Sequence, residues 1–482
     1  MASDGDPRQN VGMRIPSLFA CVVGAVALVG CGSSSPSGFD PDGGTGVDGS
    51  TPDDDSGFPD FPDASVEAAP PCVGLKCQQV TCSSGKTTVS GTVYDPAGKN
   101  PLYNVVVYVP NADLDPIKHG PVCDSCGGAN ISGSPVVTAL TDAKGKFVLE
   151  NVPVGANIPL VMQAGKWRRK IILPNVTQCV DNPVGQKTAG VENITRLARK
   201  KSEGDMPLIA LAAGCDPIHT LVQKIGIDVG ELTAETGTGT VHVFAGASNQ
   251  NGGIAGATDA YAFWGNKAKM MKYDIIINEC ECSPYLRSTM GPAYTNMKDY
   301  LTAGGRVFSS HYHLNFYGAD PINTGGAADP MLQAAASWTL WSGSSTSSPY
   351  LIDTSFPKGK ALDDWLHNLA TASGWGSSLP ITSPKGQITT SNVGDIGAAK
   401  AGFSQRWIYP QAGGSVSYIS INMPTNVPAD QRCGRAVGSD IHVGNGSLTT
   451  MTEQEAALEF MFFDLASCVI DDGKVPVPPP PN

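Results

Sequence analysis

The alternation of hydrophobic and polar positions changes along the chain and predicts two folded regions. From residue 88, apolar and polar residues alternate in short runs such as residues 89–94, and the turns between runs are rich in Asp, Pro and Gly. A period of two predicts strands with one buried face, and frequent turns favour antiparallel pairing. We therefore expect a small all-β sandwich over residues 86–173.

From residue 206, short apolar runs alternate with segments in which apolar residues recur every three or four positions. Such runs are typical of buried parallel strands, and such segments are typical of helices with one buried face. Thr452 and Glu455 form a capping box at the start of the last segment. The alternation predicts a doubly wound, flavodoxin-like α/β domain over residues 206–470, with a Gly/Ser/Thr-rich insertion at residues 320–400, so the chain is multidomain. The expected strands lie at residues 208–213, 241–245, 273–278, 306–310, 415–421 and 435–439.

The remaining segments lack such periodicity. Residues 32–71 contain nine acidic residues and no Lys or Arg among Gly, Ser, Pro and Asp, which predicts a disordered acidic tether. Residues 471–482 end in four prolines and predict a disordered tail. Residues 174–205 form a basic connector. A polyanion site is one interpretation of its charge, and we favour a solvated strand edge that links the domains.

The N-terminal region resembles a bacterial targeting segment. Met13 and Arg14 precede an apolar run over residues 18–29, which is too short to span a membrane. The run ends in LVGC, which resembles the lipobox of bacterial lipoproteins. That resemblance implies a signal peptide over residues 13–31 and acylation of Cys31. Gly32 in place of Asp implies a lipid anchor in the bacterial outer membrane, facing the periplasm or the outside. A cleaved secretory signal is the alternative.

Two further resemblances concern the folded regions. The segments VSGTVYDPAGKNPLYNVVVYVPN and TDAKGKFVLENVPVG resemble the carboxypeptidase-regulatory-like domain, a transthyretin-like sandwich, which implies a structural or adhesive module. The segments MKDYLTAGGRVFSSHYH and CGRAVGSDIHVG resemble the trehalose-utilisation-like branch of the glutamine-amidotransferase-like fold. The complete layout is similar to secreted lipoproteins of the myxobacterial type.

Composition indicates the kind of cellular compartment in which the protein lies and the class of partner that it binds. The 482 residues carry a net charge of −12, which argues against nucleic acid as a partner. Thirteen cysteines indicate an oxidising compartment and structural disulfides. Cys433 and Cys468 flank the last expected strand and helix, and we expect them to pair. Eleven cysteines follow Cys31, so at least one of them has no partner within the chain.

Residues able to carry chemistry follow three of the expected strands. Ligands of a doubly wound sheet bind at the carboxyl ends of its strands, where we expect these side chains to meet. Cys280 can serve as a nucleophile, with His311 or His442 as its base and Glu279 or Glu281 orienting that base. Two glutamates beside a thiol disfavour the thiolate, which weakens this hypothesis.

The same segment offers an alternative as a metal site. Cys280 and Cys282 alternate, as do His311 and His313, and alternate residues of a strand share one face. Cys and His are zinc ligands, so zinc is the cofactor that these four residues favour, if any is bound.

The sequence therefore predicts a lipid-anchored envelope protein that acts as a binding or structural module. Its partners are the bilayer, through Cys31, and an unidentified envelope or extracellular ligand. The alternative is a hydrolase or metal-dependent enzyme at the same strand ends. The expected ligand site comprises Glu279, Cys280, His311, His313 and His442.

Overall fold

A computed structural model describes most of the chain from residue 72 onwards. The expected signal peptide, the lipidation site Cys31 and the tether lie outside the described residues. All described residues belong to one compact unit, Pro70–Asn482, which contains several β-sheets. The described residues are 72–123, 131–185, 194–281, 290–318, 328–338, 349–369, 376–381, 388–391, 404–412, 416–442, 448–449 and 451–481.

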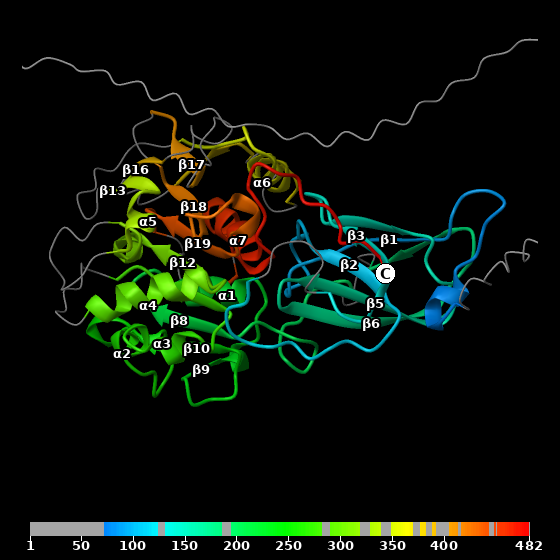
Figure 1. Cartoon of the computed structure of the whole chain (residues 1–482), viewed down its shortest axis with the longest axis horizontal. Coiled ribbons are helices and arrows are strands. Elements are labelled where there is room, and N and C mark those ends of the chain that lie inside the picture. The colour runs from blue at the N-terminus through cyan, green and yellow to red at the C-terminus, as the bar shows by residue number, and fades with distance from the viewer. Residues whose placement is uncertain are drawn as a thin grey trace, which may run out of the picture. The chain divides into compact units, whose positions relative to one another are not determined.

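Two small sheets form the first half of this unit (Figure 1). One has the strand order β4-β1-β7 and the other the order β3-β2-β5-β6. Their buried faces share a core that includes Val89, Val107 and Ile158. The sheets extend beyond the expected boundary at residue 173, because β6 continues past it and β7 follows. The strands are β1 (Thr88–Thr92), β2 (Val106–Pro110), β3 (Pro135–Leu140), β4 (Lys146–Glu150), β5 (Gly155–Ala164), β6 (Trp167–Val176) and β7 (Asp181–Val184), and a short 3₁₀ helix, η1 (Gly74–Gln78), precedes them.

The second half is built on a large mixed sheet. In the described part of the chain it has ten strands in the order β15-β14-β17-β18-β19-β12-β11-β8-β10-β9. The six strands from β19 to β9 are parallel, and the other four are antiparallel. The strands are β8 (Ile209–Ala213), β9 (Leu232–Thr233), β10 (Val241–Ala245), β11 (Ile275–Asn278), β12 (Arg306–Ser310), β14 (Tyr350–Ile352), β15 (Ser378–Leu379), β17 (Gln405–Pro410), β18 (Tyr418–Met423) and β19 (Gly434–Ser439).

Helices cover both faces of this sheet, because the parallel strands are apolar on both sides. Helices α1 (Ile218–Lys224) and α7 (Glu453–Ala466) pack with Ile209 and Leu211 of β8. On the other face, α2 (Ala260–Trp264), α3 (Lys267–Met270) and α4 (Gly291–Thr302) pack with Ala210 and Ala212.

The expected insertion at residues 320–400 contributes strands β14 and β15 to one end of the large sheet. It also contains α5 (Pro330–Gln333), α6 (Pro357–Asn368) and a separate pair of strands, β13 (Ala336–Trp338) and β16 (Ile388–Ser391). In the described residues, no helix combines the length and the apolar character that crossing a bilayer requires.

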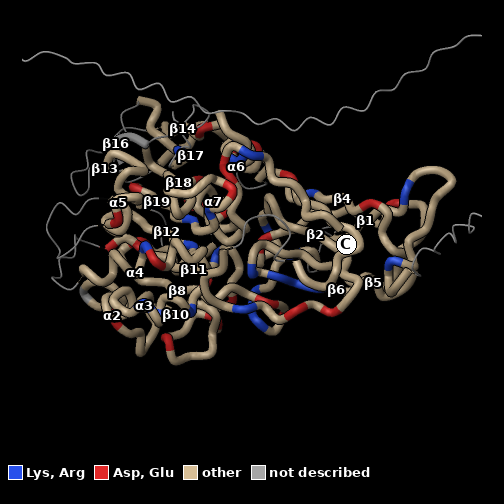
Figure 2. The backbone as a smooth tube through the Cα atoms, in the orientation of Figure 1, with Lys and Arg blue, Asp and Glu red and all other residues tan. Residues whose placement is uncertain are grey.

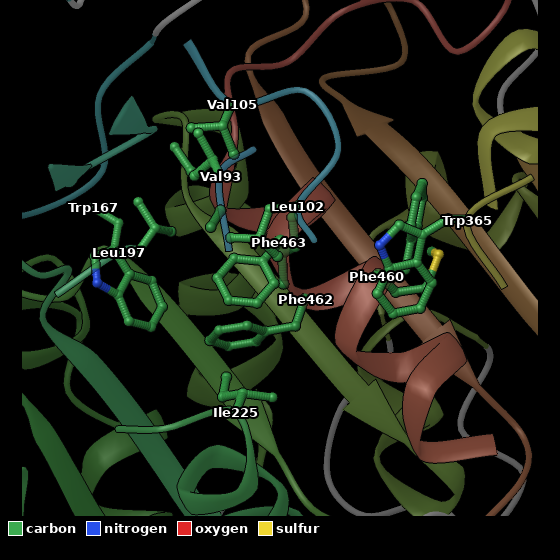
Figure 3. Close-up of a cluster of buried hydrophobic side chains, with 14 of the residues drawn as sticks. Val93, Leu102, Val105, Trp167, Leu197, Ile225, Trp365, Phe460, Phe462 and Phe463 are labelled. Atoms are coloured by element: carbon green, nitrogen blue, oxygen red, sulfur yellow. The ribbon is translucent and has the colours of Figure 1, made fainter. Parts of the chain in front are cut away.

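A single core connects the small sheets to helix α7 (Figure 3). The turn at residues 95–101 inserts between α1, α6 and α7, and we call this contact the joint. The backbone N–H of Ala97 donates to the carbonyl of Ile225 (2.9 Å), and the indole N–H of Trp365 donates to the carbonyl of Pro101 (2.6 Å). The rings of Tyr103 and Phe460 stack at 5.6 Å.

A disulfide also links the two halves, and it corrects the expected pairing. Cys433 is bonded to Cys123, 310 residues away, and not to Cys468. Cys468 and Cys215 each take part in a disulfide as well. The expectation rested on flanking positions along the chain, whereas a disulfide requires Cα atoms about 4.4–6.8 Å apart in space. Cys72–Cys77 and Cys82–Cys179 form two further bridges.

The C-terminal residues differ from the expected disordered tail. Residues 471–481 form no helix or strand, but the carbonyl of Pro479 accepts a hydrogen bond from the hydroxyl of Thr138 on β3 (2.5 Å). The tail therefore returns to the small sheets.

Candidate functional site

Four neighbouring parallel strands each end in a polar residue at the same edge of the large sheet. Asp216 follows β8, Cys280 follows β11, His311 follows β12 and His442 follows β19. These strands lie side by side in the order β19-β12-β11-β8, so their carboxyl ends bring residues that are distant in sequence into contact.

Cys280, His311 and His442 form a compact set of donor atoms, which we call the rim cluster. The thiol sulfur of Cys280 lies 2.9 Å from Nδ1 of His311 and 4.0 Å from Nε2 of His442. All three donor atoms lie within 4.8 Å of one another, so the cluster can hold a metal ion. Cys280 is a buried thiol, His311 is buried, and the side chain of His442 is 26% exposed, which leaves one side of the cluster accessible.

Asp216 fixes the orientation of His442. Its carboxylate accepts a hydrogen bond from Nδ1 of His442 and another from the hydroxyl of Ser310 (2.7 Å). With the proton on Nδ1, Nε2 of His442 presents its lone pair towards Cys280. Asp216 itself is buried.

His311 has an unusual backbone conformation. Its φ is +45°, in the left-handed region, which costs a residue other than glycine about 1–3 kcal/mol. This conformation turns the chain at the end of β12, where the 3₁₀ helix η4 (His311–Phe316) begins. The ring of His311 lies 4.7 Å from that of His442 and 4.0 Å from that of Tyr312. Burial, and then the charge that Cys280 carries when ionised, raise the pKa of Tyr312.

The two expected orienting residues do not contact the histidines of the rim cluster. Glu279 is buried and accepts hydrogen bonds from the backbone of Gly214 (2.8 Å) and from the backbone (2.5 Å) and ring (3.0 Å) of His219. Burial raises the pKa of Glu279, although His219 opposes the shift. Glu281 accepts from the hydroxyl of Tyr261 (2.8 Å). The orienting carboxylate is therefore Asp216.

The expected metal site of two cysteines and two histidines also requires a correction, which concerns one of the histidines. Cys282 lies outside the described residues. His313 does not join the rim cluster, because it packs against the rings of Trp264 (5.0 Å) and Phe316 (5.9 Å). Its Nε2 lies 3.7 Å from the carboxylate of Glu281. Strand β12 ends at Ser310, and in a 3₁₀ helix alternate residues point about 120° apart instead of sharing a face.

Close backbone packing supports the position of Cys280. The carbonyl of Cys280 accepts a hydrogen bond from the backbone N–H of Cys215 (2.6 Å). A Cβ atom on Gly214 would lie 2.2 Å from that carbonyl oxygen, so only glycine fits at the end of β8. Cys215 is itself disulfide-bonded, so it does not offer a thiol beside Cys280.

Asp216 is the site residue that the sequence analysis missed. The adjacent Pro217 is typical of a helix start and does not by itself indicate a site. The signal was present, however, because Asp216 follows an expected strand just as Cys280, His311 and His442 do.

In the described residues of the basic connector, Arg196 and Arg199 both pair with Glu203, at 2.7 Å each. A cavity of about 280 Å³ lies at the amino ends of β11 and β12, with Lys166 and Arg168 among its lining residues. Lys166 pairs with Asp274 (2.7 Å), and Arg168 pairs with Asp205 (2.8 Å). Figure 2 shows acidic and basic residues interspersed along the described chain.

Comparison with known proteins adds no further constraint on the site. No protein-family model matches the chain, and no curated protein matches it.

Proposed function

We propose that the chain is a zinc-dependent hydrolase of the bacterial cell envelope, with Cys280, His311 and His442 as its protein ligands. The observation that carries the proposal is the convergence of one thiol and two imidazole nitrogens, from three strand ends, within 4.8 Å. Three protein ligands leave one coordination position open, which is typical of catalytic zinc and not of closed structural sites. Zinc in such a site activates a water molecule for attack on an acyl or phosphoryl group.

The distances within the rim cluster suit a tetrahedral ion. With Zn–S of about 2.3 Å and Zn–N of about 2.0–2.1 Å, a sulfur and a nitrogen ligand lie about 3.5 Å apart. The two sulfur–nitrogen distances, 2.9 and 4.0 Å, bracket this value. Small rotations of the two imidazole rings are enough to accommodate the ion.

The surroundings of the ligands support a metal site as well. Histidine ligands of metals usually donate their second ring N–H to a carboxylate, as His442 does to Asp216. This contact holds the imidazole in the tautomer whose Nε2 can coordinate. The strained backbone of His311 holds the second imidazole against the thiol.

The fold places the rim cluster where α/β proteins bind ligands. Numbered along the chain, β8, β10, β11, β12 and β19 lie in the order 2-1-3-4-5, which is the order of flavodoxin-like, doubly wound sheets. In this order the direction of winding reverses between β8 and β11. Asp216 and Cys280 follow those two strands.

The envelope location rests on the sequence. An acylated Cys31 would hold the chain on the outer membrane through the acidic tether, and several acyl chains anchor more stably than one. The disulfides of the described residues agree with an oxidising compartment. A binding or structural module would need no open coordination position, so the rim cluster favours the enzyme.

The zinc content of purified full-length chain tests this proposal. We expect one zinc ion per chain, and we expect Cys280→Ser, His311→Ala and His442→Ala each to lower zinc affinity by at least about 100-fold. Asp216→Asn, which removes the acceptor behind His442, is expected to lower it by about 10- to 100-fold. Cobalt substitution should add a sulfur-to-metal charge-transfer band that Cys280→Ser abolishes.

His313→Gln is the matched control, because His313 belongs to the same H-x-H motif but lies outside the rim cluster. It should retain one zinc ion per chain and the cobalt band. The proposal is wrong if the wild-type chain, refolded with excess zinc and dialysed, retains none. Zinc loss in His313→Gln together with zinc retention in His442→Ala would move the site to the other imidazole.

A cysteine hydrolase is the second candidate, favoured by the 2.9 Å contact between Cys280 and His311. An imidazole at this distance can accept the thiol proton. In metal-free protein we expect iodoacetamide to alkylate Cys280, and His311→Ala to slow that reaction at pH 7 by about tenfold or more. Alkylation that is equally fast with and without bound zinc would favour this second candidate.

A further inference from the structure

Two carboxyl groups meet in the core of the joint without any cation between them. Asp95, in the turn at residues 95–101, is 1% exposed, and Glu459, on α7, is 0% exposed. Asp95 Oδ1 accepts from the backbone N–H of Lys99 (2.7 Å), and Glu459 Oε2 accepts from the side-chain amide of Asn100 (2.6 Å). The other two oxygens, Asp95 Oδ2 and Glu459 Oε1, receive no hydrogen bond from the described residues.

Asn100, in the same turn as Asp95, brings that turn against Glu459, and the charge of Asp95 acts on the pKa of Glu459. Two ionised carboxylates in contact repel, and a buried carboxylate oxygen without a donor is strongly disfavoured. A proton placed between Asp95 Oδ2 and Glu459 Oε1 removes both penalties, because one group then donates to the other. Burial raises the pKa of Asp95 to about 7, and burial followed by the charge of Asp95 raises that of Glu459 well above its usual value.

The charged groups around this pair are engaged elsewhere or exposed. Lys224 and Glu455, one turn earlier on α7, pair with each other at 2.5 Å. Asp464, just over one turn later, pairs with Arg435 (2.8 Å) and Lys358 (2.7 Å). Lys99 acts on Asp95 through its charge, but its side chain is exposed. Tyr103 stacks on Phe460 and has its own pKa raised by burial.

The turn at residues 95–101 packs closely against the end of α1. Gly226 has φ of +98°, and a Cβ atom there would lie 2.1 Å from the nitrogen of Ala97. Both carboxyl groups are buried while the turn lies between α1 and α7, so an ionised pair is poorly hydrated there. Loss of the proton therefore favours release of the turn.

We propose that the joint is a pH-sensitive latch. A proton that Asp95 and Glu459 share keeps it closed, and it opens when a rise in pH transfers that proton to hydroxide in the solvent. One carboxylic acid becomes a carboxylate, and the two anions separate into water. The direction of the pH dependence follows from the linkage between proton binding and closure of the joint. In the open state both carboxyl groups ionise at a lower pH than in the closed joint. Between these two pH values only the closed joint holds the proton, so closure weakens as pH rises. Opening changes how the small sheets are held against helix α7, and it leaves the rim cluster unchanged.

Hydrogen exchange of the full-length chain between pH 5.5 and 8.5, corrected for intrinsic exchange, tests the latch. Protection of the Ala97 amide is expected to fall about tenfold per pH unit from pH 5.5 upwards, because free carboxyls ionise near pH 4 and opening therefore releases one proton, and to level off once the closed joint has lost its proton as well. Asp95→Asn keeps the shape and supplies an N–H donor to Glu459, so protection should stay flat. Glu459→Gln should give the same flat profile and replaces Asp95→Asn if that variant does not fold.

Asp142→Asn is the matched control, since Asp142 occupies a similar turn, DAKG, on an exposed part of the small sheets. It should keep the wild-type pH response. Constant protection of Ala97 in the wild type from pH 5.5 to 8.5 would overturn the proposal. A wild-type pH response in both Asp95→Asn and Glu459→Gln would overturn it as well.

Discussion

Replacement of Arg435 by alanine is expected to lower the free energy of unfolding by about 3–5 kcal/mol. Arg435 is fully buried at the start of β19 and pairs with Asp464 (2.8 Å) and Asp472 (3.0 Å). Its guanidinium also donates to the side chain of Asn422 (2.7 Å). Removal of the cation would leave two carboxylates in a buried site with only Lys358, which lies 2.7 Å from Asp464.

The pKa of Asp464 gives this network a pH dependence. Burial raises the pKa, but Arg435 and Lys358 outweigh burial and hold the pKa below its usual value. A carboxyl whose pKa is lowered by folding stabilises the native state above its unfolded pKa, near pH 4, and loses that contribution as pH falls. Arg435→Ala should therefore destabilise the chain most at neutral pH and less in acid.

Chemical denaturation at pH 7 measures this effect. Lys360→Ala is the control, because Lys360 pairs with Asp364 on the exposed side of α6, with side chains 63% and 46% exposed. A change within about 0.5 kcal/mol is expected for this surface pair. If Arg435→Ala and Lys360→Ala lowered the free energy of unfolding by the same amount, the stabilising role of Arg435 in the core would be contradicted.

Removal of the Cys123–Cys433 disulfide is expected to have a similarly large effect. The double variant Cys123→Ser, Cys433→Ser opens a loop of 310 residues, and the loop-entropy relation predicts a loss of about 6 kcal/mol. The bridge also joins the loop after β2 to the start of β19, so its loss should loosen the contact between the small sheets and the large sheet. Thermal unfolding under non-reducing conditions measures the change.

The Cys72–Cys77 bridge provides the comparison. It closes a separation of only five residues, for which the same relation predicts about 2 kcal/mol. The variant Cys72→Ser, Cys77→Ser should therefore unfold at a higher temperature than Cys123→Ser, Cys433→Ser. The reverse order would show that the long bridge forms without stabilising the fold.

Local patterns predicted the strands and helix caps well. The apolar run at residues 208–213 contains β8, because a strand buried on both faces must be apolar throughout. The capping box of Thr452 and Glu455 is confirmed at the start of α7. Both features depend on residues within a few positions of one another.

Contacts between distant residues could not be predicted in the same way. The pairing of Cys123 with Cys433 depends on where the loop after β2 lies against β19, which no local pattern encodes. The exclusion of His313 from the rim cluster follows from the turn at His311, which ends the strand at Ser310, before the H-x-H motif. The sequence did place Cys280, His311 and His442 at neighbouring strand ends, because parallel strands share an edge. The orienting carboxylate was predicted incorrectly, since side-chain direction beyond a strand end is set by packing.

The rim cluster also links ligand binding to completion of the fold. Asp216 and His442 are 226 residues apart in sequence, and they meet only after β19 has paired with β12. An unfolded or partly translocated chain therefore has no assembled site and gains nothing from zinc. A ligand that binds only the completed sheet stabilises it by mass action, by about 4 kcal/mol at a free concentration 1,000 times Kd. The proposed zinc ion would thus stabilise only chains whose last parallel strand is in place.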